Sequence, residues 1–252
     1  MVSHDEQVDR QFGPVAAAYL SSAVHAQGAE LADTAVLLRG CTRVLDVGCG
    51  AGHLAFAVAP QVGAIVACDL SPEMLAAVDA EAARRGLRNL STQRGAAEAL
   101  PFPDGAFDAV CTRFSAHHWA DLARGLAEMR RVLKPGGRAI VIDIVAPPAA
   151  LLDTHLQAVE LLRDPSHVRD YSLAEWAERL NRAGLHVGAQ RSWALRMEFD
   201  TWVARMRTPA DRVAVLRGLL QGAPHEVRAH FKVGDDASFD IEAAMIECRA
   251  AA

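Results

Sequence analysis

The strongest chemical signal in the chain is a glycine-rich segment that directly follows an apolar run. Residues 44–52 read VLDVGCGAG, and a second apolar run, residues 64–68, ends in Asp69. Glycines let a backbone approach a ligand without a Cβ clash. An acid at the tip of the second strand can accept hydrogen bonds from two ribose hydroxyls. The pattern therefore indicates a strand, a glycine turn that opens a helix, and a second strand, which together hold a nucleoside-bearing cofactor.

The glycine spacing narrows the choice of cofactor. Gly48, Gly50 and Gly52 form G-x-G-x-G, whereas a dinucleotide fingerprint has G-x-G-x-x-G and places a pyrophosphate at a helix N-terminus. Asp46, just before the first glycine, would repel a pyrophosphate but can help to hold an ammonium group. S-adenosylmethionine (SAM) has no phosphate and carries an amino-acid end. The residues therefore favour SAM over NAD, and an NAD-dependent oxidoreductase is the alternative from another enzyme class.

Composition and charge are those of an ordinary globular domain. With 252 residues, 51% of them hydrophobic and 23% charged, one core-sized domain is expected rather than two. The formal net charge is −5, and Lys and Arg occur only singly or in scattered pairs. A phosphate-backbone partner normally requires a basic face. The acidic balance therefore argues against nucleic acid as a partner and favours a small-molecule acceptor.

The lengths of the apolar runs and the spacing of the cysteines indicate the cellular compartment of the protein. No apolar stretch reaches the roughly 18 residues that a membrane span needs, and the polar residues 1–10 lack a secretory signal. Five cysteines occur without a C-x-x-C pair: Cys41, Cys49, Cys68, Cys111 and Cys248. We expect buried thiols in a reducing compartment rather than metal ligands or redox pairs. The protein is therefore expected in the cytoplasm, without a membrane span.

Strand and helix patterns alternate over residues 40–145. Strands are expected at 43–48, 64–69, 91–95, 107–112 and 138–145, and helices at 52–60, 72–86 and 121–133. The strands are apolar without strict alternation, which fits a parallel sheet covered on both faces. Repeated right-handed βαβ units place a ligand crevice at the carboxyl ends of such strands.

The flanking segments are expected to complete a single domain over residues 1–252. Its expected parts are an N-terminal helical lid at 1–40, a SAM-binding core at 41–145, and a substrate-side half at 146–252 with helical insertions at 149–183 and 199–231. Asp200 is the expected cap of the first helix in the second insertion. Strands at 185–196 and 239–248 are expected to pair antiparallel. The expected fold is α/β: a Rossmann-like, seven-stranded sheet, mostly parallel with the last strand antiparallel, with helices on both faces.

Two segments carry a family resemblance. Residues 44–52 resemble the first motif of class I SAM-dependent methyltransferases. Residues 95–110, GAAEALPFPDGAFDAV, closely resemble the G-D-A-E-x-L-P-F-x-D-x-S-F-D-x-V pattern of ubiquinone/menaquinone-type methyltransferases. In that family this segment wraps the adenine, and the acid of G-D-A receives its exocyclic amine. Ala96 replaces that acid here, so the resemblance implies that the amine meets a backbone carbonyl, Glu98 or water.

The resemblance also assigns roles beyond the fourth strand. In the family, the backbone at the positions of Arg113 and Phe114 contacts the methionine moiety. His117 and His118 follow in an H-H-x-x-D pattern, and their near-neutral pKa suits a general base. The structural alternative is that one histidine braces the loop against Asp121 while the other lines the pocket. A zinc site is not expected, because adjacent loop histidines seldom chelate one ion and no Cys or acid cluster completes it.

Further resemblances concern the lid and the substrate side. Tyr19 resembles part of the family's aromatic lid over the methionine end of SAM. Residues 163–176 are similar to a subgroup typified by bacterial YcgJ-type proteins, which makes His167, Arg169 and Trp176 candidates for the substrate wall. The apolar lid helices fit either a cover for the site or a homodimer interface.

The sequence therefore predicts an enzyme that transfers a methyl group from SAM to a small molecule by in-line displacement, mainly through proximity and exclusion of water. A non-catalytic SAM sensor or partner subunit is the alternative. Leu70 and Met74, after Asp69, are expected to pack on adenine, although plain core packing explains them equally. The candidate catalytic residues are His117 and His118, and the candidate cofactor-binding residues are Tyr19, Asp46, Gly48, Cys49, Gly50, Gly52, Asp69, Leu70, Met74, Ala96, Ala97, Glu98, Arg113 and Phe114.

Overall fold

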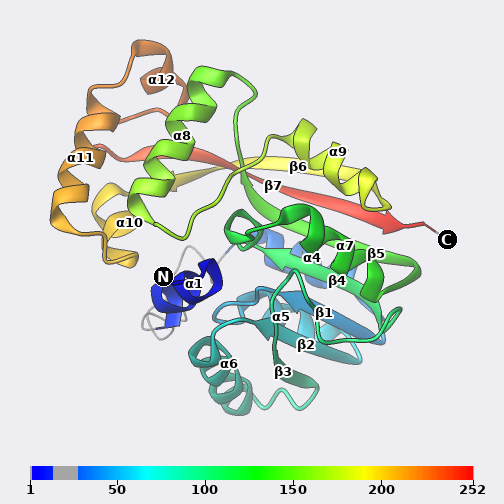
Figure 1. The fold of residues 1–252 in the computed structure, drawn as a ribbon. Helices are drawn as coiled ribbons and strands as arrows, with labels where there is room; N and C mark the ends of the chain where they lie inside the picture. Colours follow the sequence, from blue (N-terminus) through cyan, green and yellow to red (C-terminus); the bar gives the residue numbers. More distant parts are fainter. Residues whose placement is uncertain (1, 14–27, 252) are drawn as a thin grey trace.

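A seven-stranded sheet in the order β3-β2-β1-β4-β5-β7-β6 organises the molecule (Figure 1). The computed structural model describes residues 2–13 and 28–251. The strands are β1 (Arg43–Val47), β2 (Ala64–Asp69), β3 (Leu90–Arg94), β4 (Phe107–Arg113), β5 (Leu133–Val145), β6 (Leu185–Met197) and β7 (Phe239–Ala250). Strands β1 to β5 pair in parallel, and β7 lies antiparallel to both β5 and β6. This confirms the predicted fold, including the antiparallel last strand.

The helices follow the predicted alternation. They are α1 (His4–Phe12), α4 (Ala29–Leu37), α5 (His53–Val58), α6 (Pro72–Arg85), α7 (Leu122–Val132), α8 (Ala150–Arg163), α9 (Leu173–Arg182), α10 (Phe199–Arg205), α11 (Ala210–Gln221) and α12 (His225–His230), with short 3-10 turns η2 (Ala59–Gln61) and η3 (Ala116–His118). Within the described ranges, no helix is long and apolar enough to cross a bilayer. Residues 14–27 of the predicted N-terminal lid, Tyr19 among them, lie outside the described residues.

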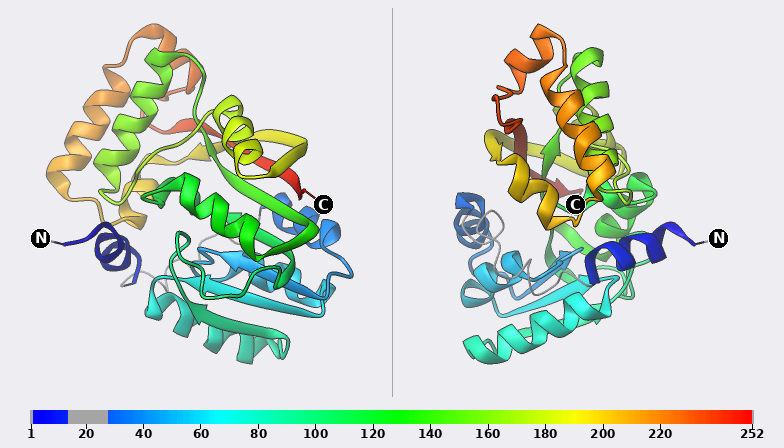
Figure 2. Two further views of the ribbon diagram at one scale, coloured as in Figure 1. Left: turned by 45° about the vertical axis from the view of Figure 1, so that its right-hand side comes forward. Right: turned by 90° about the vertical axis from the view of Figure 1, so that its left-hand side faces the viewer.

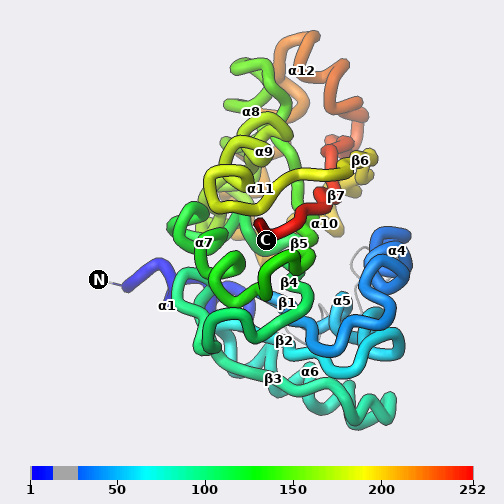
Figure 3. The backbone as a smooth tube through the Cα atoms, turned by 90° about the vertical axis from the view of Figure 1, so that its right-hand side faces the viewer, coloured from blue at the N-terminus to red at the C-terminus, as the bar shows by residue number. Residues whose placement is uncertain are grey.

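Two apolar layers cover the sheet. Helices α7 and α9 pack on one face, with Leu126, Met129 and Trp176 buried against the strands. Helices α4, α5 and α6 pack on the other face, as Figure 3 shows from the end of the sheet. Helix α4, which was expected in the lid, therefore belongs to the core: its residues Leu31 and Ala35 are buried against that second face.

A third apolar cluster stands beyond the carboxyl end of β5. Helices α8, α10, α11 and α12 gather there around the buried Trp202 and Phe239, clear of β2 and β3 (Figure 2). Helix α1 lies against the near end of this cluster, where the Gln11 side-chain amide donates to the Met206 carbonyl at 3.1 Å. The helical insertions thus form a wall over one end of the crevice, next to α1.

Local signals explain where several helices begin and end. Pro72 opens α6 and Gly86 closes it in the left-handed region at φ 70°. Ser172 and Glu175 form a capping box at the start of α9. Asp200 was wrongly predicted as a cap: Glu198 precedes α10, and Asp200 lies in its first turn and pairs with Arg217 at 2.8 Å.

The fifth strand begins earlier than predicted. Leu133 already pairs with Phe107, and regular pairing resumes at Arg138, opposite Ala109. The intervening residues 134–137 bulge out of the ladder, with Gly136 at φ 68°. The Pro-Gly-Gly segment at 135–137 is therefore an irregularity inside β5 rather than a turn before it.

A buried ion pair connects α4 to the end of β4. The Arg113 guanidinium lies 2.7 Å from the Glu30 carboxylate, and both side chains are only 5% exposed. Two charges removed from water are stable only when they neutralise each other. This pair therefore fixes the first core helix to the strand end that borders the crevice.

Substituting Glu30→Gln is expected to lower the free energy of unfolding by about 3–5 kcal/mol, because the Arg113 cation stays buried without its counter-charge. Urea denaturation measures this loss. The matched control is Glu178→Gln, since Glu178 pairs with Arg182 at 2.6 Å while both side chains are largely exposed; its cost should stay below about 1 kcal/mol. Equal small losses in the two variants would contradict the role given to the buried pair.

Candidate functional site

A cleft opens at the carboxyl ends of β1, β2 and β4. It encloses about 1010 Å³, including its mouth to solvent. Its walls come from the ends of the strands, the start of α6, the loop after β3, turn η3 and helix α1. The lining residues are Asp5, Val8, Phe12, Asp46, Gly48, Cys49, Gly50, Ala51, His53, Leu54, Asp69, Leu70, Ser71, Met74, Gly95, Ala97, Glu98, Arg113, Phe114, Ser115, His118 and Trp119.

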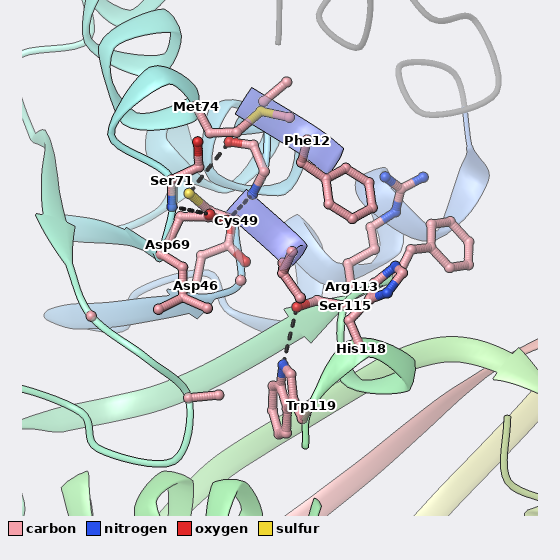
Figure 4. A pocket seen from close by; sticks show the side chains of 18 of the residues that line it. Phe12, Asp46, Cys49, Asp69, Ser71, Met74, Arg113, Ser115, His118 and Trp119 are labelled. Carbon is pink, nitrogen blue, oxygen red and sulfur yellow. Dashed lines mark hydrogen bonds between the residues drawn. The ribbon is translucent and has the colours of Figure 1, made fainter. Parts of the chain in front are cut away.

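Figure 4 shows the two acids of the cleft, Asp46 and Asp69, close together on one wall, and Phe12, Arg113 and His118 across from them. Most of the predicted cofactor-binding residues thus meet in one place. The parallel strands bring them there, since their carboxyl ends share one edge of the sheet.

The glycine turn needs its glycines for two different reasons. A Cβ on Gly48 would lie 1.8 Å from the Ser115 hydroxyl, so the turn packs directly on the loop after β4. Gly50 has φ 50° and open space where a Cβ would project. A side chain there would be strained and would fill part of the cleft. The turn is therefore shaped to keep backbone, not side chains, against whatever occupies the cleft.

Asp69 fastens this turn to the end of β2. Its carboxylate accepts the Gly50 amide at 2.8 Å and the Ser71 amide at 3.0 Å. Burial raises the pKa of Asp69, and these hydrogen bonds oppose the rise. Each oxygen retains a lone pair, so the carboxylate can still accept a further hydrogen bond.

Asp46 is the anomalous group of the cleft. It is 1% exposed, and neither carboxylate oxygen has a hydrogen-bond partner within the described part of the chain. Burial raises the pKa of Asp46 to about 7, against the opposing charge of Arg113. The nearby Ala55 amide slightly lowers the pKa of Asp46, but its geometry is not that of a hydrogen bond. Unpaired buried carboxylates are costly, so this side chain is suited to a cation that enters the cleft.

The apolar walls agree with only part of the prediction. Leu70 and the fully buried Met74 lie on one side, and Ala97 and Glu98 follow β3. Ala96, in contrast, does not line the cleft, because it forms a small bridge with Ala99.

Gly52 is a second correction. It precedes α5 at φ 83°, and a Cβ there would lie 2.8 Å from the Val78 side chain. Its role in this fold is to let α5 pack closely on α6, and it does not border the cleft.

A second cavity of about 580 Å³ adjoins the cleft on the side of the helical insertions. Phe12, Phe114 and His118 line both spaces. The other lining residues are His117, Ile144, Glu160, Arg163, Asp164, Leu195, Met197, Trp202, Arg205, Met206 and Ile241. A molecule in the cleft and a molecule in this cavity would therefore meet beside Phe114 and His118.

Phe114 is held at this junction in an uncommon backbone conformation, with φ 50°. Its amide donates to the Ile142 carbonyl at 2.8 Å, and the Arg113 guanidinium lies 4.5 Å from the centre of its ring. Left-handed backbone at a bulky residue persists only where the surroundings fix it. These contacts turn the ring toward the two cavities.

His117 pairs with a buried acid that the sequence analysis did not select. Its Nδ1 lies 2.5 Å from Asp143 Oδ1, and its backbone amide donates to Asp143 Oδ2 at 3.2 Å. Burial lowers the pKa of His117, but the Asp143 carboxylate reverses this effect and raises it to about 9. Asp121 was the expected partner of a histidine; it caps α7 by accepting the Arg124 amide instead.

His118 has the opposite character. Its Nδ1 donates to the Ser166 carbonyl at 3.1 Å, and the Phe12 ring packs edge-on against it at 4.9 Å. Burial, together with the neighbouring charge of His117, lowers the pKa of His118 to about 4. At neutral pH the two adjacent histidines therefore carry different charges.

Three other candidates lie outside both cavities. Trp176 is buried in the core under α9, Arg169 pairs with Asp153 at 2.9 Å, and His167 bonds the Gln157 side chain at 3.0 Å. Neither cavity therefore supports the predicted substrate-wall role, because the segment after α8 turns these residues toward the core and toward α8. Within the described ranges, no three metal-ligating side chains converge.

Asp143 was missed, although a signal was present. It is the single acid in the apolar run 139–146, and a lone acid in a buried strand needs a partner. The missed Ser115 and Trp119 carry no comparable signal. They reach the cleft because Trp119 donates to Ser115 at 3.1 Å and packs on Gly125, where a Cβ would lie 2.4 Å from the indole ring.

Comparisons with known proteins agree with this geometry. Residues 45–141 match a family model described as a methyltransferase domain. The chain is 46% identical over 201 residues to the uncharacterized protein YafE of Escherichia coli, covering 80% of this chain and 97% of that protein. It is 38% identical over 210 residues to the uncharacterized methyltransferase YcgJ of Bacillus subtilis, covering 81% of this chain and 83% of that protein.

The similarity extends to a solved structure and, over the core, to a methyltransferase with a named substrate. The crystal structure of Bacillus subtilis YcgJ matches with a TM-score of 0.84 at 35% identity, over 88% of this chain and 98% of that chain. A demethylmenaquinone methyltransferase of Thermus thermophilus is 44% identical over 108 residues, 42% of this chain and 49% of that protein. The chain therefore belongs to the class I SAM-dependent methyltransferases of the ubiquinone/menaquinone and YcgJ type.

Proposed function

We propose that SAM occupies the cleft between Asp46, Asp69 and Phe114, and that a small-molecule acceptor occupies the adjoining cavity. The observation that carries this proposal is the buried carboxylate of Asp46, whose two oxygens accept no hydrogen bond from the residues that the structure describes. The ammonium of an amino-acid moiety is a cation of the right size for that position. SAM supplies a methyl group on a positively charged sulfur, which is already activated for transfer.

The remaining contacts of the cleft fit the other parts of SAM. Asp69 is fixed by two backbone amides and has lone pairs left for ribose hydroxyls. Leu70 and Met74 offer an apolar surface to adenine on one side, and Ala97 with Glu98 borders the opposite side. The open space at Gly50 lets the backbone approach the ligand.

The acceptor side is proposed from its position and lining. The second cavity meets the cleft at Phe114 and His118, so an acceptor there would face the methyl-bearing end of the cofactor. Apolar side chains from the helical insertions form most of its wall. A relative over the core acts on demethylmenaquinone, according to its name. This supports a small organic acceptor, whereas nothing in the cleft favours NAD or a non-catalytic role.

The protein contributes to this reaction mainly by aligning the methyl donor and the acceptor. Aligning donor and acceptor in line can contribute about 7–11 kcal/mol of barrier reduction. Helix α1 closes one side of the site: His4 donates to the His118 carbonyl at 2.7 Å, and Gln7 donates to the Pro165 carbonyl at 2.5 Å. These contacts hold α1 against the turn that separates the two cavities, where it helps to keep water out. We also propose a cytoplasmic location, which the free cysteines of the chain support.

The cofactor proposal predicts binding of SAM and S-adenosylhomocysteine that depends on the glycine turn. Asp69→Ala removes the anchor of Gly50, and Gly50→Val forces a β-branched residue to φ 50° and into the cleft. Each substitution is expected to weaken binding at least tenfold in isothermal titration. Glu178→Gln, on the far helix α9, is the control and should bind like the unaltered chain. Undiminished binding in both cleft variants would refute this placement of SAM.

A second prediction concerns pH and Asp46. The pKa of its carboxyl is about 7 in the empty cleft. An entering ammonium favours the ionised form and lowers this pKa. Below pH 7, SAM binding should therefore release a proton and weaken by up to about tenfold per pH unit, which titration in two buffers of different ionisation enthalpy detects.

Two controls isolate the Asp46 effect. Asp46→Asn should remove the pH dependence, and 5′-methylthioadenosine, which lacks the amino-acid moiety, should bind without it. A pH dependence shared by SAM and 5′-methylthioadenosine would place the titrating group elsewhere.

A further inference from the structure

A third cavity lies at the amino-terminal edge of the parallel strands, on the opposite side of the sheet from the cofactor cleft. It encloses about 790 Å³, including its mouth to solvent. Figure 3 looks onto this edge, where the end of β7 lies beside β5. Among the described residues, its charged lining consists of four cations and one acid: Arg39, Lys134, Arg138, Arg249 and Asp108. The chain as a whole carries a formal net charge of −5, so this cavity is a basic exception.

The acid of this cavity is already used by the protein. The Asp108 carboxylate accepts hydrogen bonds from Lys134 Nζ at 2.5 Å and from the Arg43 amide at 2.7 Å. Lys134 and Asp108 therefore neutralise each other at the irregular start of β5. In the described part of the chain, none of the three arginines of the cavity forms an ion pair with a carboxylate.

The contacts that these arginines do make are with uncharged groups. Arg39 donates to the Gln61 side chain at 3.1 Å, and Arg249 donates to the Gly136 carbonyl at 3.4 Å. A neutral acceptor leaves the guanidinium charge in place, and each guanidinium has five N–H donors. The arginines thus keep both charge and donors for a further partner.

The register between β5 and β7 sets two of these cations against each other. Arg138 and Arg249 are direct partners in the antiparallel ladder, so their side chains leave the same face of the sheet next to each other. Like charges in such directly opposed positions are destabilising. Glu247, two residues before Arg249 on β7, forms no ion pair with either arginine within the described ranges. The pair is therefore uncompensated unless an anion joins it.

The thiol of Cys41 indicates that both guanidinium groups converge on the cavity. Cys41 lines the cavity just before β1 and is partly buried. Burial raises the pKa of this thiol and Asp108 adds to the rise, whereas Arg138 and Arg249 oppose it. The two arginines, which come from different strands, thus act on the same point of the wall.

We propose that this cavity binds a phosphate group, free or as the monoester of a small molecule, between Arg138 and Arg249. A phosphate monoester carries close to two negative charges at pH 7 and offers three acceptor oxygens. The guanidinium fork matches these oxygens in bidentate geometry. One dianion neutralises both arginines and removes their repulsion, whereas a carboxylate neutralises only one. This site is separate from the cofactor cleft and does not depend on the function proposed for that cleft.

Titration with inorganic phosphate at constant ionic strength, followed by ¹H–¹⁵N NMR, tests the site. The amides of Gly40 and Gly136, which line the cavity, should shift and reach saturation. Arg138→Gln and Arg249→Gln should each weaken binding at least about tenfold, because a hydrogen bond between charged partners is lost. Arg182→Gln is the matched control, since it removes one arginine from the exposed side of α9, and it should bind phosphate like the unaltered chain.

A second readout needs no substitution. Phosphate between the arginines would cancel their effect on the Cys41 thiol and cover it, so saturating phosphate should slow alkylation of Cys41 by iodoacetamide several-fold. Alkylation of Cys49, which lines the cofactor cleft, should stay unchanged. Mass spectrometry of the alkylated peptides separates the two sites.

The choice of ligand identifies the source of the phosphate. Tighter binding of glycerol 3-phosphate than of inorganic phosphate would support a phosphorylated small molecule, and equal binding would support free phosphate. Shifts that do not saturate, undiminished binding in both arginine variants, equally tight binding of acetate, or tighter binding of a short RNA would each overturn the inference. None of these outcomes bears on SAM binding, which titration of the cofactor cleft measures separately.

Discussion

The shared edge at which β1, β2 and β4 end is the constraint on which the site depends. In the register of the sheet, Asp46 lies beside Ala67 of β2 and Cys111 of β4, so Asp69 and Arg113 each follow two residues later on the flanking strands. Three charged residues from distant parts of the sequence thus reach one crevice. A parallel sheet does this without long loops, because every strand delivers its carboxyl end to the same side.

The charges at this edge are distributed unequally, and that inequality makes a binding site. Arg113 is neutralised by Glu30, and Asp69 is satisfied by two backbone amides. Asp46 receives neither an ion pair nor a hydrogen bond from residues 2–13 or 28–251. The fold therefore carries an unfavourable buried carboxyl that a cationic ligand would relieve, which links the stability of the empty protein to its affinity for that ligand.

The second cavity also lies beside a buried acid, but this acid, Asp143, is hydrogen-bonded, whereas Asp46 is not, within the described ranges. Asp143 accepts three hydrogen bonds, two from His117 and one from the Ile144 amide, and its charge raises the pKa of His117. His118, one residue on, has no such acid within hydrogen-bond distance and has a lowered pKa. Successive side chains of a 3-10 helix such as η3 diverge by about 120°, although the two rings still touch, with their centroids 4.2 Å apart. His117 consequently lines only the second cavity, whereas His118 borders both the cleft and the second cavity.

The sequence by itself determined the sheet, the glycine turn and the two acids of the cofactor cleft. These depend on local patterns: apolar runs of strand length, glycines at fixed spacing, and an acid at or near the end of each of the first two strands. Only the tertiary structure decided that Gly52 serves helix packing, that Ala96 is turned away, and that His117 belongs with Asp143. Those outcomes depend on the register between β4 and β5 and on how α5 meets α6, and such long-range packing leaves no periodic signal in a single chain.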